Sequence, residues 1–270
     1  MLDWVVVAPI VLVAALVIAF VIASALSPVT PRDVAWISGD DVPPADEARV
    51  YARYLWRHRA HRVVGGVFGA CVALVVVVRW SAPLGAQEVA LGAASDPLLC
   101  TMSGVVIGAL SAETFRLRQP RIAAASLRQR AALPRTGVAK AALVLVGSAF
   151  LLSLVLVVAG DGTTALGAAV IGGGTVLLGH ATRRAIVGRA RPVMSARAAR
   201  VDAHMRAFAA ESVAWLQLAA AVLTCSWVVS PLIADGLGTV AGLGCLVAVV
   251  VLLRRAKPRP ARSWRPAVLG

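Results

Sequence analysis

The sequence predicts an all-α fold, that of a polytopic integral membrane protein with about seven transmembrane helices. The chain has 270 residues, of which 59% are hydrophobic and 15% are charged, whereas soluble domains carry about 25% charged residues. The apolar residues fall in long charge-free blocks, which is the pattern of membrane-spanning helices. The basic residues, which give a net charge of +14, fall between these blocks, so membrane topology explains the charge without nucleic acid.

The first apolar block covers residues 4–26, and about 20 residues suffice to cross the hydrocarbon core of a bilayer. We expect residues 1–26 to form a permanent N-terminal anchor. Asp3 gives the leading residues a negative charge, whereas a signal peptide begins with positive charge and has an apolar region of roughly 7–15 residues.

Residues 27–62 are expected to form a cytoplasmic loop whose second half is an amphipathic helix. Asp46 and Glu47 begin this helix, and arginines follow near its end, as the helix macrodipole favours. Its apolar face consists of Val50, Tyr51, Tyr54 and Leu55. We expect the helix to lie on anionic lipid at the membrane surface; a soluble partner is the alternative occupant of the same face.

Six further apolar blocks predict a membrane domain over residues 63–254, built from three helical hairpins and followed by a basic cytoplasmic tail at residues 255–270. The blocks are residues 63–80, 98–112, 139–160, 163–181, 208–234 and 237–253. Each hairpin ends in a glycine-containing helix followed by an Arg- and Pro-rich exit. This similarity indicates either a duplication or features common to membrane helices.

The basic residues also predict the orientation of the chain. Arg and Lys gather in residues 49–62, 116–140, 183–206 and 254–265, and the intervening connections lack them. Cytoplasmic loops carry this excess, so we expect the N-terminus outside and the C-terminus inside the plasma (inner) membrane. The arginines expected to contact anionic headgroups are Arg57, Arg59, Arg62, Arg116, Arg118, Arg183, Arg184 and Arg191.

One basic stretch resembles a catalytic motif. Arg184, six further residues and then Arg191-Pro192 are similar to the first motif of the phosphatidate-phosphatase superfamily, which is Lys, six residues and Arg-Pro. The resemblance implies a membrane-embedded lipid-phosphate enzyme. The family's Pro-Ser-Gly-His motif and its Ser-Arg with the nucleophilic His do not follow Arg191. We therefore interpret the stretch as part of a basic loop.

Glu113, His180 and Glu211 are ionisable residues near the ends of apolar blocks, where charge is costly and often functional. If their helices are adjacent, two carboxylates and an imidazole can bind a cation or relay a proton. This would suit a small transporter or channel. The alternative is that all three lie at headgroup depth, with Glu113 paired to Arg116 or Arg118.

Gly167, Gly179 and the triplet at residues 172–174 give one apolar block a face of small residues. Such a face predicts close packing between helices. The alternative is a hinge at a transport site.

The sequence contains no recognisable catalytic, cofactor or metal motif, so we expect no cofactor. Its four cysteines lie in apolar blocks, where they act as small hydrophobic residues. We therefore expect an accessory or scaffold component of a membrane complex, with another membrane protein or a second copy as its partner. A small transporter or channel is the first alternative, and a lipid-phosphate enzyme is the second.

Overall fold

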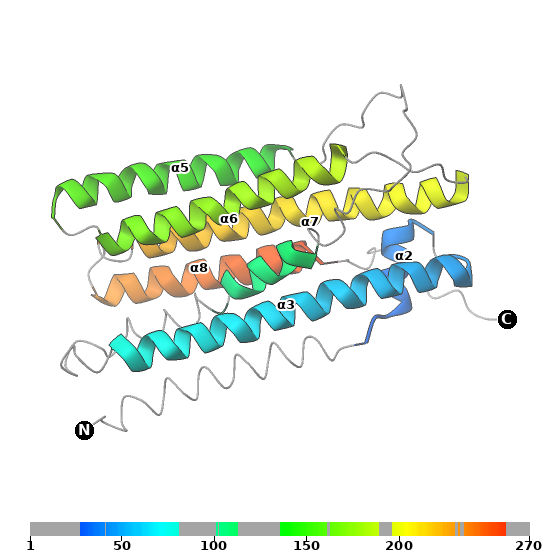
Figure 1. Ribbon diagram of the computed structural model, residues 1–270, viewed down its shortest axis with the longest axis horizontal. Coiled ribbons are helices and arrows are strands. Elements are labelled where there is room, and N and C mark those ends of the chain that lie inside the picture. Colours follow the sequence, from blue (N-terminus) through cyan, green and yellow to red (C-terminus); the bar gives the residue numbers. More distant parts are fainter. Residues whose placement is uncertain are drawn as a thin grey trace.

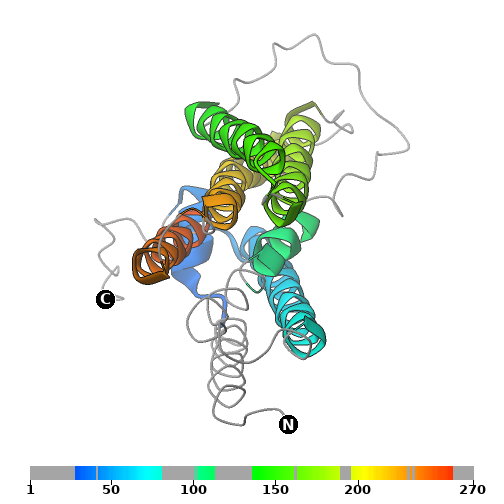
Figure 2. The same cartoon turned by 90° about the vertical axis from the view of Figure 1, so that its left-hand side faces the viewer.

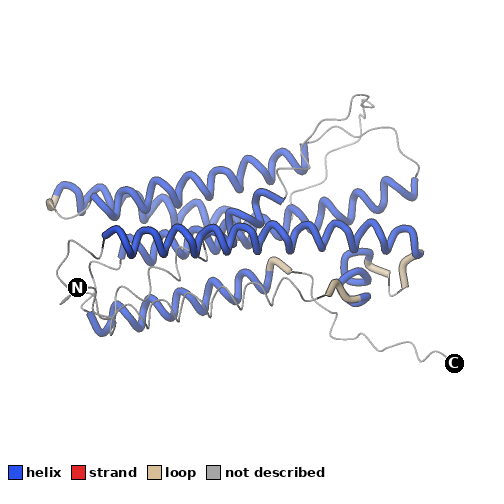
Figure 3. The backbone as a smooth tube through the Cα atoms, turned by 60° about the horizontal axis from the view of Figure 1, so that its bottom comes forward, coloured by secondary structure: helices blue, strands red, loops and turns tan. Residues whose placement is uncertain are grey.

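A computed structural model describes residues 28–40, 42–80, 101, 103–112, 136–160, 163–188, 196–229, 232 and 235–257. Within these ranges all regular secondary structure is helical, with no strand (Figure 3). The predicted all-α class is confirmed for this part of the chain. The expected N-terminal anchor lies outside it.

Four long helices run side by side in a bundle (Figure 1). They are α5 (Thr136–Val158), α6 (Thr163–Gly188), α7 (Ala196–Val229) and α8 (Asp235–Arg255). Helix α7 packs against the other three, and the end-on view shows it between them (Figure 2). A short apolar helix, Ser103–Ala112, packs into the same core.

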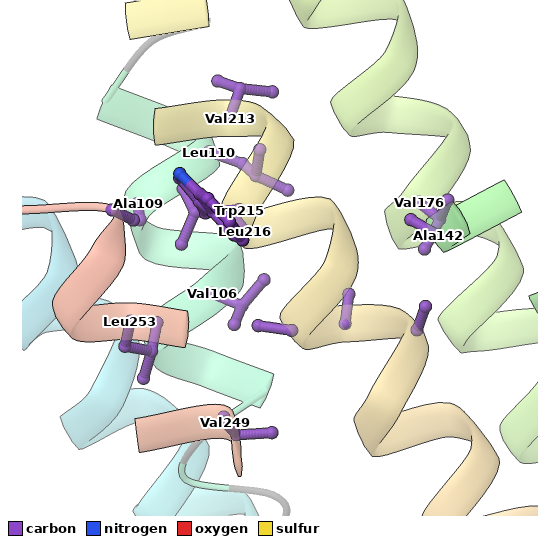
Figure 4. Packing of buried hydrophobic residues seen from close by; sticks show 14 of the residues in the cluster. Val106, Ala109, Leu110, Ala142, Val176, Val213, Trp215, Leu216, Val249 and Leu253 are labelled. Atoms are coloured by element: carbon purple, nitrogen blue, oxygen red, sulfur yellow. The ribbon is translucent and has the colours of Figure 1, made fainter. Parts of the chain in front are cut away.

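Small side chains allow α7 to be buried on several sides at once. Ala209, Ala219 and Ala221 are almost fully buried in the core cluster, and small residues let helix backbones approach closely. Figure 4 shows Val213 and Leu216 of α7 among apolar residues of neighbouring helices. The centre of the bundle is therefore a packed apolar core.

Three of the described helices are long and apolar enough to cross a membrane: Gly137–Ala159, Ala165–Gly188 and Ala196–Val229. Large apolar side chains such as Leu151 and Val155 are exposed on the outside of the bundle, as lipid-facing residues are. The molecule is thus helical with apolar helices suited to a membrane. The count of seven spans and their orientation remain predictions.

Two helices are much longer than a bilayer requires. Helix α3 (Ala45–Trp80) has 36 residues and α7 has 34, which correspond to about 54 and 51 Å at 1.5 Å per residue, against about 30 Å of hydrocarbon. Both extend beyond α5, α6 and α8 at the same end of the bundle, where α2 (Pro31–Ser38) lies against them (Figure 1). We call this part, α2 with residues 45–60 and 196–211, the head.

The head has its own apolar core, separate from that of the bundle. It consists of Val34, Ile37, Tyr51, Tyr54, Leu55, Met205 and Phe208. The ring of Phe208 meets those of Trp36 and Tyr54 edge-on, with centroids 5.6 and 5.9 Å apart, which adds to the stabilisation from burial. Helices from three places in the sequence are therefore joined by side-chain packing.

Here the structure differs from the expected membrane-surface helix. Residues 45–62 belong to the same continuous helix as residues 63–80. Three of the four apolar residues, Tyr51, Tyr54 and Leu55, are buried against α2 and α7, and only Val50 is exposed. Protein, not lipid, covers this face.

Ion pairs and caps hold the head together at both of its ends. Arg59 Nη2 lies 2.6 Å from Asp33 Oδ2, and Arg59 Nη1 donates to the Pro28 carbonyl at 2.8 Å. The Asp33 carboxylate also accepts from the backbone N–H of Thr30 in a capping box at the start of α2. At the far tip, Arg197 of α7 binds the carboxylates of Asp46, at 2.7 Å, and Glu47.

Helix α7 begins at Ala196, twelve residues before the expected block at residue 208, and α6 continues to Gly188. Much of the expected basic connection is therefore helical. Met205 and Phe208 anchor the extension in the head, and Arg206 pairs with Asp202 one turn away at 2.7 Å. Tertiary packing stabilises this charged helix where hydropathy alone predicts a loop.

Candidate functional site

Helix α3 and the Ser103–Ala112 helix cross through glycines, with their backbones in contact. A methyl group placed on Gly65 would overlap the carbonyl oxygen of Gly104 and lie 2.7 Å from the Cα of Gly108. One placed on Gly104 would lie 2.9 Å from the Cα of Gly69. Only glycine permits this approach. This crossing was not among the features predicted from the sequence, although its signal is present there as two Gly-x-x-x-Gly motifs, a known pattern of helix association in membranes.

A second close contact joins α6 to α7. A methyl group on Gly172 would overlap the side chain of Thr224, and one on Gly179 would lie 2.6 Å from Gln217 Cγ. The predicted packing role is thus confirmed for Gly172 and Gly179. The space around Gly167, Gly173 and Gly174 is open.

The side chain of Gln217 adds a polar link to this interface. Gln217 is fully buried, and its Nε2 donates to the carbonyl oxygen of Val176 at 3.1 Å. Such bonds between transmembrane helices contribute about 0.6 kcal/mol on average. Together with the glycine contacts, the bond sets the antiparallel register of α6 and α7.

An apolar pocket of about 260 Å³ lies between α3, the Ser103–Ala112 helix, α6 and α7. Its polar lining residues are Ser103, Thr175 and Thr224. The hydroxyl of Thr175 donates to the Ile171 carbonyl at 2.9 Å, and that of Thr224 donates to the Ala220 carbonyl at 2.8 Å. Because these two hydroxyls are already bonded within their own helices, the walls of the pocket are effectively hydrocarbon.

A polar layer lies between the pocket and the head. Arg62 of α3 is 7% exposed, and its Nη2 donates to the carbonyl of Ala256 at 3.1 Å and lies 3.5 Å from the Ser212 hydroxyl. Ser212 donates to the same carbonyl at 2.9 Å. These contacts join α3, α7 and the end of α8 at one level.

On the neighbouring side of α3, His61 Nδ1 lies 2.9 Å from the hydroxyl oxygen of Ser111. Ser111 donates its proton to the carbonyl of Gly108 at 2.7 Å. Because a hydroxyl has a single proton to donate, Nδ1 of His61 is the donor in their bond. In the neutral ring, Nε2 is then the acceptor.

The grouping of the ionisable trio stays a prediction. Glu113 lies outside the described residues. His180 is half-buried. Because Gly179 meets Gln217, the neighbouring His180 lies opposite Leu216 of α7. Leu216 is five residues from Glu211, or about 7.5 Å along the helix axis. Within the ranges described, no three His, Cys, Asp or Glu side chains are placed to hold a metal ion.

The Glu211 carboxylate lies near the indole of Trp215. Trp215 Nε1 lies 3.5 Å from Glu211 Oε1, and the Arg255 guanidinium lies 5.3 Å from the centroid of the Trp215 ring. The carboxylate is thus associated with an aromatic and basic cluster between α7 and α8. The Arg255–Trp215 arrangement is a cation–π contact.

The arginines expected at lipid headgroups are in several environments. Arg59 is paired with Asp33, Arg57 is half-buried, and Arg184 is exposed. Arg62 and Arg183 are 7% and 4% exposed, respectively, so both are turned into the protein. Arg116, Arg118 and Arg191 lie outside the described residues, and with Arg191 so does the end of the phosphatase-like stretch.

Comparison with protein-family models, with curated proteins and with solved structures finds no match to this chain.

Proposed function

We propose that the protein is a multi-pass plasma-membrane protein that acts as a non-catalytic accessory component and holds a partner protein at its head. The head carries this proposal. It lies beyond the apolar part of the bundle, and it is packed and ion-paired internally. Its shape therefore does not depend on a partner, as suits a preformed docking platform.

The exposed side of α3 indicates the chemistry of the partner. Arg49 and Arg53 are exposed one turn apart on the same face of the helix. Trp56, on the same side and nearer the bundle, is 67% exposed, as suits a residue at headgroup level. The two arginines lie beyond it, outside the hydrocarbon. An acidic surface on a cytoplasmic partner would complement them.

Purification from native membranes tests the proposal. The tagged protein in mild detergent should retain a partner, identified by mass spectrometry, and a photo-crosslinking residue at Arg53 should capture the same protein. A crosslinker at Leu151, on the outer face of α5, should not capture it. Isolation of the wild-type chain without a stoichiometric partner, with no capture from position 53, would contradict the proposal.

Charge reversal at Arg49 and Arg53 should release the partner and leave the amount of folded protein unchanged. Arg184→Glu is the matched control, because Arg184 is exposed on α6 outside the head. Equal partner recovery from the double variant and the wild type would exclude this face as the docking surface.

A further inference from the structure

The side-chain amide of Gln217 uses only one of its two ends. Gln217 of α7 is fully buried against α6, beside Gly179, and its Nε2 donates to the carbonyl oxygen of Val176 at 3.1 Å. A carbonyl oxygen only accepts, so this bond fixes which way the amide is turned. The amide oxygen, Oε1, is buried as well, and among the residues described it has no hydrogen-bond partner.

Thr182 of α6 is a second buried polar group in the same condition. It is 2% exposed, and its hydroxyl oxygen has no partner in the described part of the chain. Thr175 of α6 and Thr224 of α7 each donate to the carbonyl four residues earlier, which is a common bond for threonine within a helix. The Thr182 hydroxyl does not make that bond. Because buried polar groups are nearly always bonded to protein or to ordered water, both unpaired atoms call for a partner.

The register of α6 and α7 places the two groups on neighbouring turns of one interface. The helices are antiparallel and Gly179 meets Gln217, so Thr182, three residues later in α6, lies opposite Ala214, three residues earlier in α7. Thr182 and Gln217 are therefore about 4.5 Å apart along the axis. Side chains lean toward the N-terminus of their own helix. In this antiparallel pair, the two side chains consequently lean toward each other.

The chemistry of the two groups defines what fits between them. The Thr182 hydroxyl and the Gln217 amide oxygen do not bond to each other, so an occupant must bond to both. Neither group is charged, and an ion in these apolar surroundings would be costly. The residues that flank the two groups, Gly179 and Ala214, are small. An uncharged molecule that both donates and accepts, of the size of one water, matches these requirements.

We propose that one water molecule is bound between α6 and α7, where it donates to Gln217 Oε1 and accepts from the Thr182 hydroxyl. Buried waters of this kind make two to four hydrogen bonds and belong to the structure. A water bridge joins two polar groups nearly as well as a direct bond does. The site lies within the candidate spans Ala165–Gly188 and Ala196–Val229, and it does not depend on a partner at the head.

Solid-state NMR of the wild-type protein in lipid bilayers tests for the water. Magnetisation transferred from water should reach the Thr182 side chain several-fold faster than the Thr224 side chain. Thr224 is the matched control, because it is buried at the same interface and its hydroxyl is already bonded to the Ala220 carbonyl. Gln217→Leu should slow the transfer at Thr182 to the rate at Thr224. Equal rates at the two threonines in the wild type would overturn the proposal.

Stability measurements test the bridge in a second way. Thr182→Val keeps the shape of the side chain and removes the hydroxyl, so it should raise the unfolding equilibrium constant about fivefold, as the loss of one hydrogen bond does. Without a bridge, the same substitution would leave that constant unchanged or lower it, because an unpaired buried hydroxyl is itself costly. In a Gln217→Leu background, Thr182→Val should lose its effect.

The two measurements separate a water bridge from the other arrangements. An equal effect of Thr182→Val in both backgrounds would show that the two groups share no partner, and would contradict the site. Coupling between the substitutions with slow water transfer at Thr182 would mean that the side chains bond directly, and would overturn the water. If Gln217→Leu does not fold, the comparison of Thr182 with Thr224 in the wild type decides the question.

Discussion

Gly65 of α3 and Gly104 of the Ser103–Ala112 helix lie so close that a Cβ placed on either would overlap the carbonyl oxygen of the other. Backbone contact replaces side-chain interdigitation at this crossing. The two backbones therefore gain dispersion contacts directly, and the glycines lose no side-chain entropy. The crossing also forms one wall of the apolar pocket through Gly69 and Gly104.

Replacement of Gly65 by Ala should separate the two helices. We expect a loss of about 1–3 kcal/mol in the free energy of unfolding, because the added methyl group meets backbone that cannot move aside. Thermal unfolding in detergent measures the loss. Gly147→Ala is the control: nothing lies near Gly147 in α5, so Ala should be neutral or stabilising by up to about 1 kcal/mol. Equal stability of the two variants would contradict the backbone contact.

Gly172 and Thr224 should show coupled effects. Gly172→Ala is expected to destabilise the protein because its methyl group overlaps the Thr224 side chain, and Thr224→Ala should relieve that overlap. The double variant should therefore be more stable than the sum of the single effects predicts, by about 0.5–3 kcal/mol. Gly173→Ala, adjacent but in open space, should show no coupling to Thr224→Ala.

Asp33→Asn should loosen α2. The substitution removes both the ion pair to Arg59 and the charge of the capping box at Thr30, for which we expect about 1–2 kcal/mol. Hydrogen exchange of the α2 amides should accelerate several-fold. Asp40→Asn is the control, because Asp40 is exposed and lies just beyond the end of α2. Unchanged protection in the Asp33 variant would show that packing alone holds α2.

The tip of the head should respond to acid. Desolvation acts to raise the pKa of Asp46, but backbone hydrogen bonds and the charge of Arg197 outweigh it and lower the pKa below the ordinary value of 3.8. A lowered carboxyl pKa means that the contact is fully present above the ordinary pKa and is lost as the pH falls through the lowered value. Spin labels at Ala198 and Arg49 should therefore move apart below about pH 4. In a variant that carries both Asp46→Asn and Glu47→Gln, which removes both carboxylates that Arg197 binds, the separation should not change with acid in this range.

Cysteine labelling tests the predicted orientation. In a cysteine-free background, Arg200→Cys in the head should react with a membrane-impermeant reagent only after the cells are permeabilised. Val158→Cys, 89% exposed at the opposite end of α5, should react in intact cells. The reverse pattern would invert the topology. Reaction of both positions from the same side would contradict the placement of α5 across the membrane.

The sequence by itself determined the local features of this protein. The N-terminal ends of the expected blocks 139–160 and 163–181 agree closely with those of α5 and α6. Hydropathy depends only on residues that are neighbours in the sequence, so it locates apolar helices without knowledge of the fold. Only the tertiary structure decided what covers each face. The amphipathic pattern in residues 45–62 indicates that one face of the helix is covered, but lipid and protein would both satisfy that pattern. In the structure, α2 and α7 cover this face. In the same way, the environments of Arg62 and Glu211 depend on which helices, distant in sequence, pack beside them. The register of α6 and α7, which places His180, is set by glycine contacts whose partners no single segment specifies.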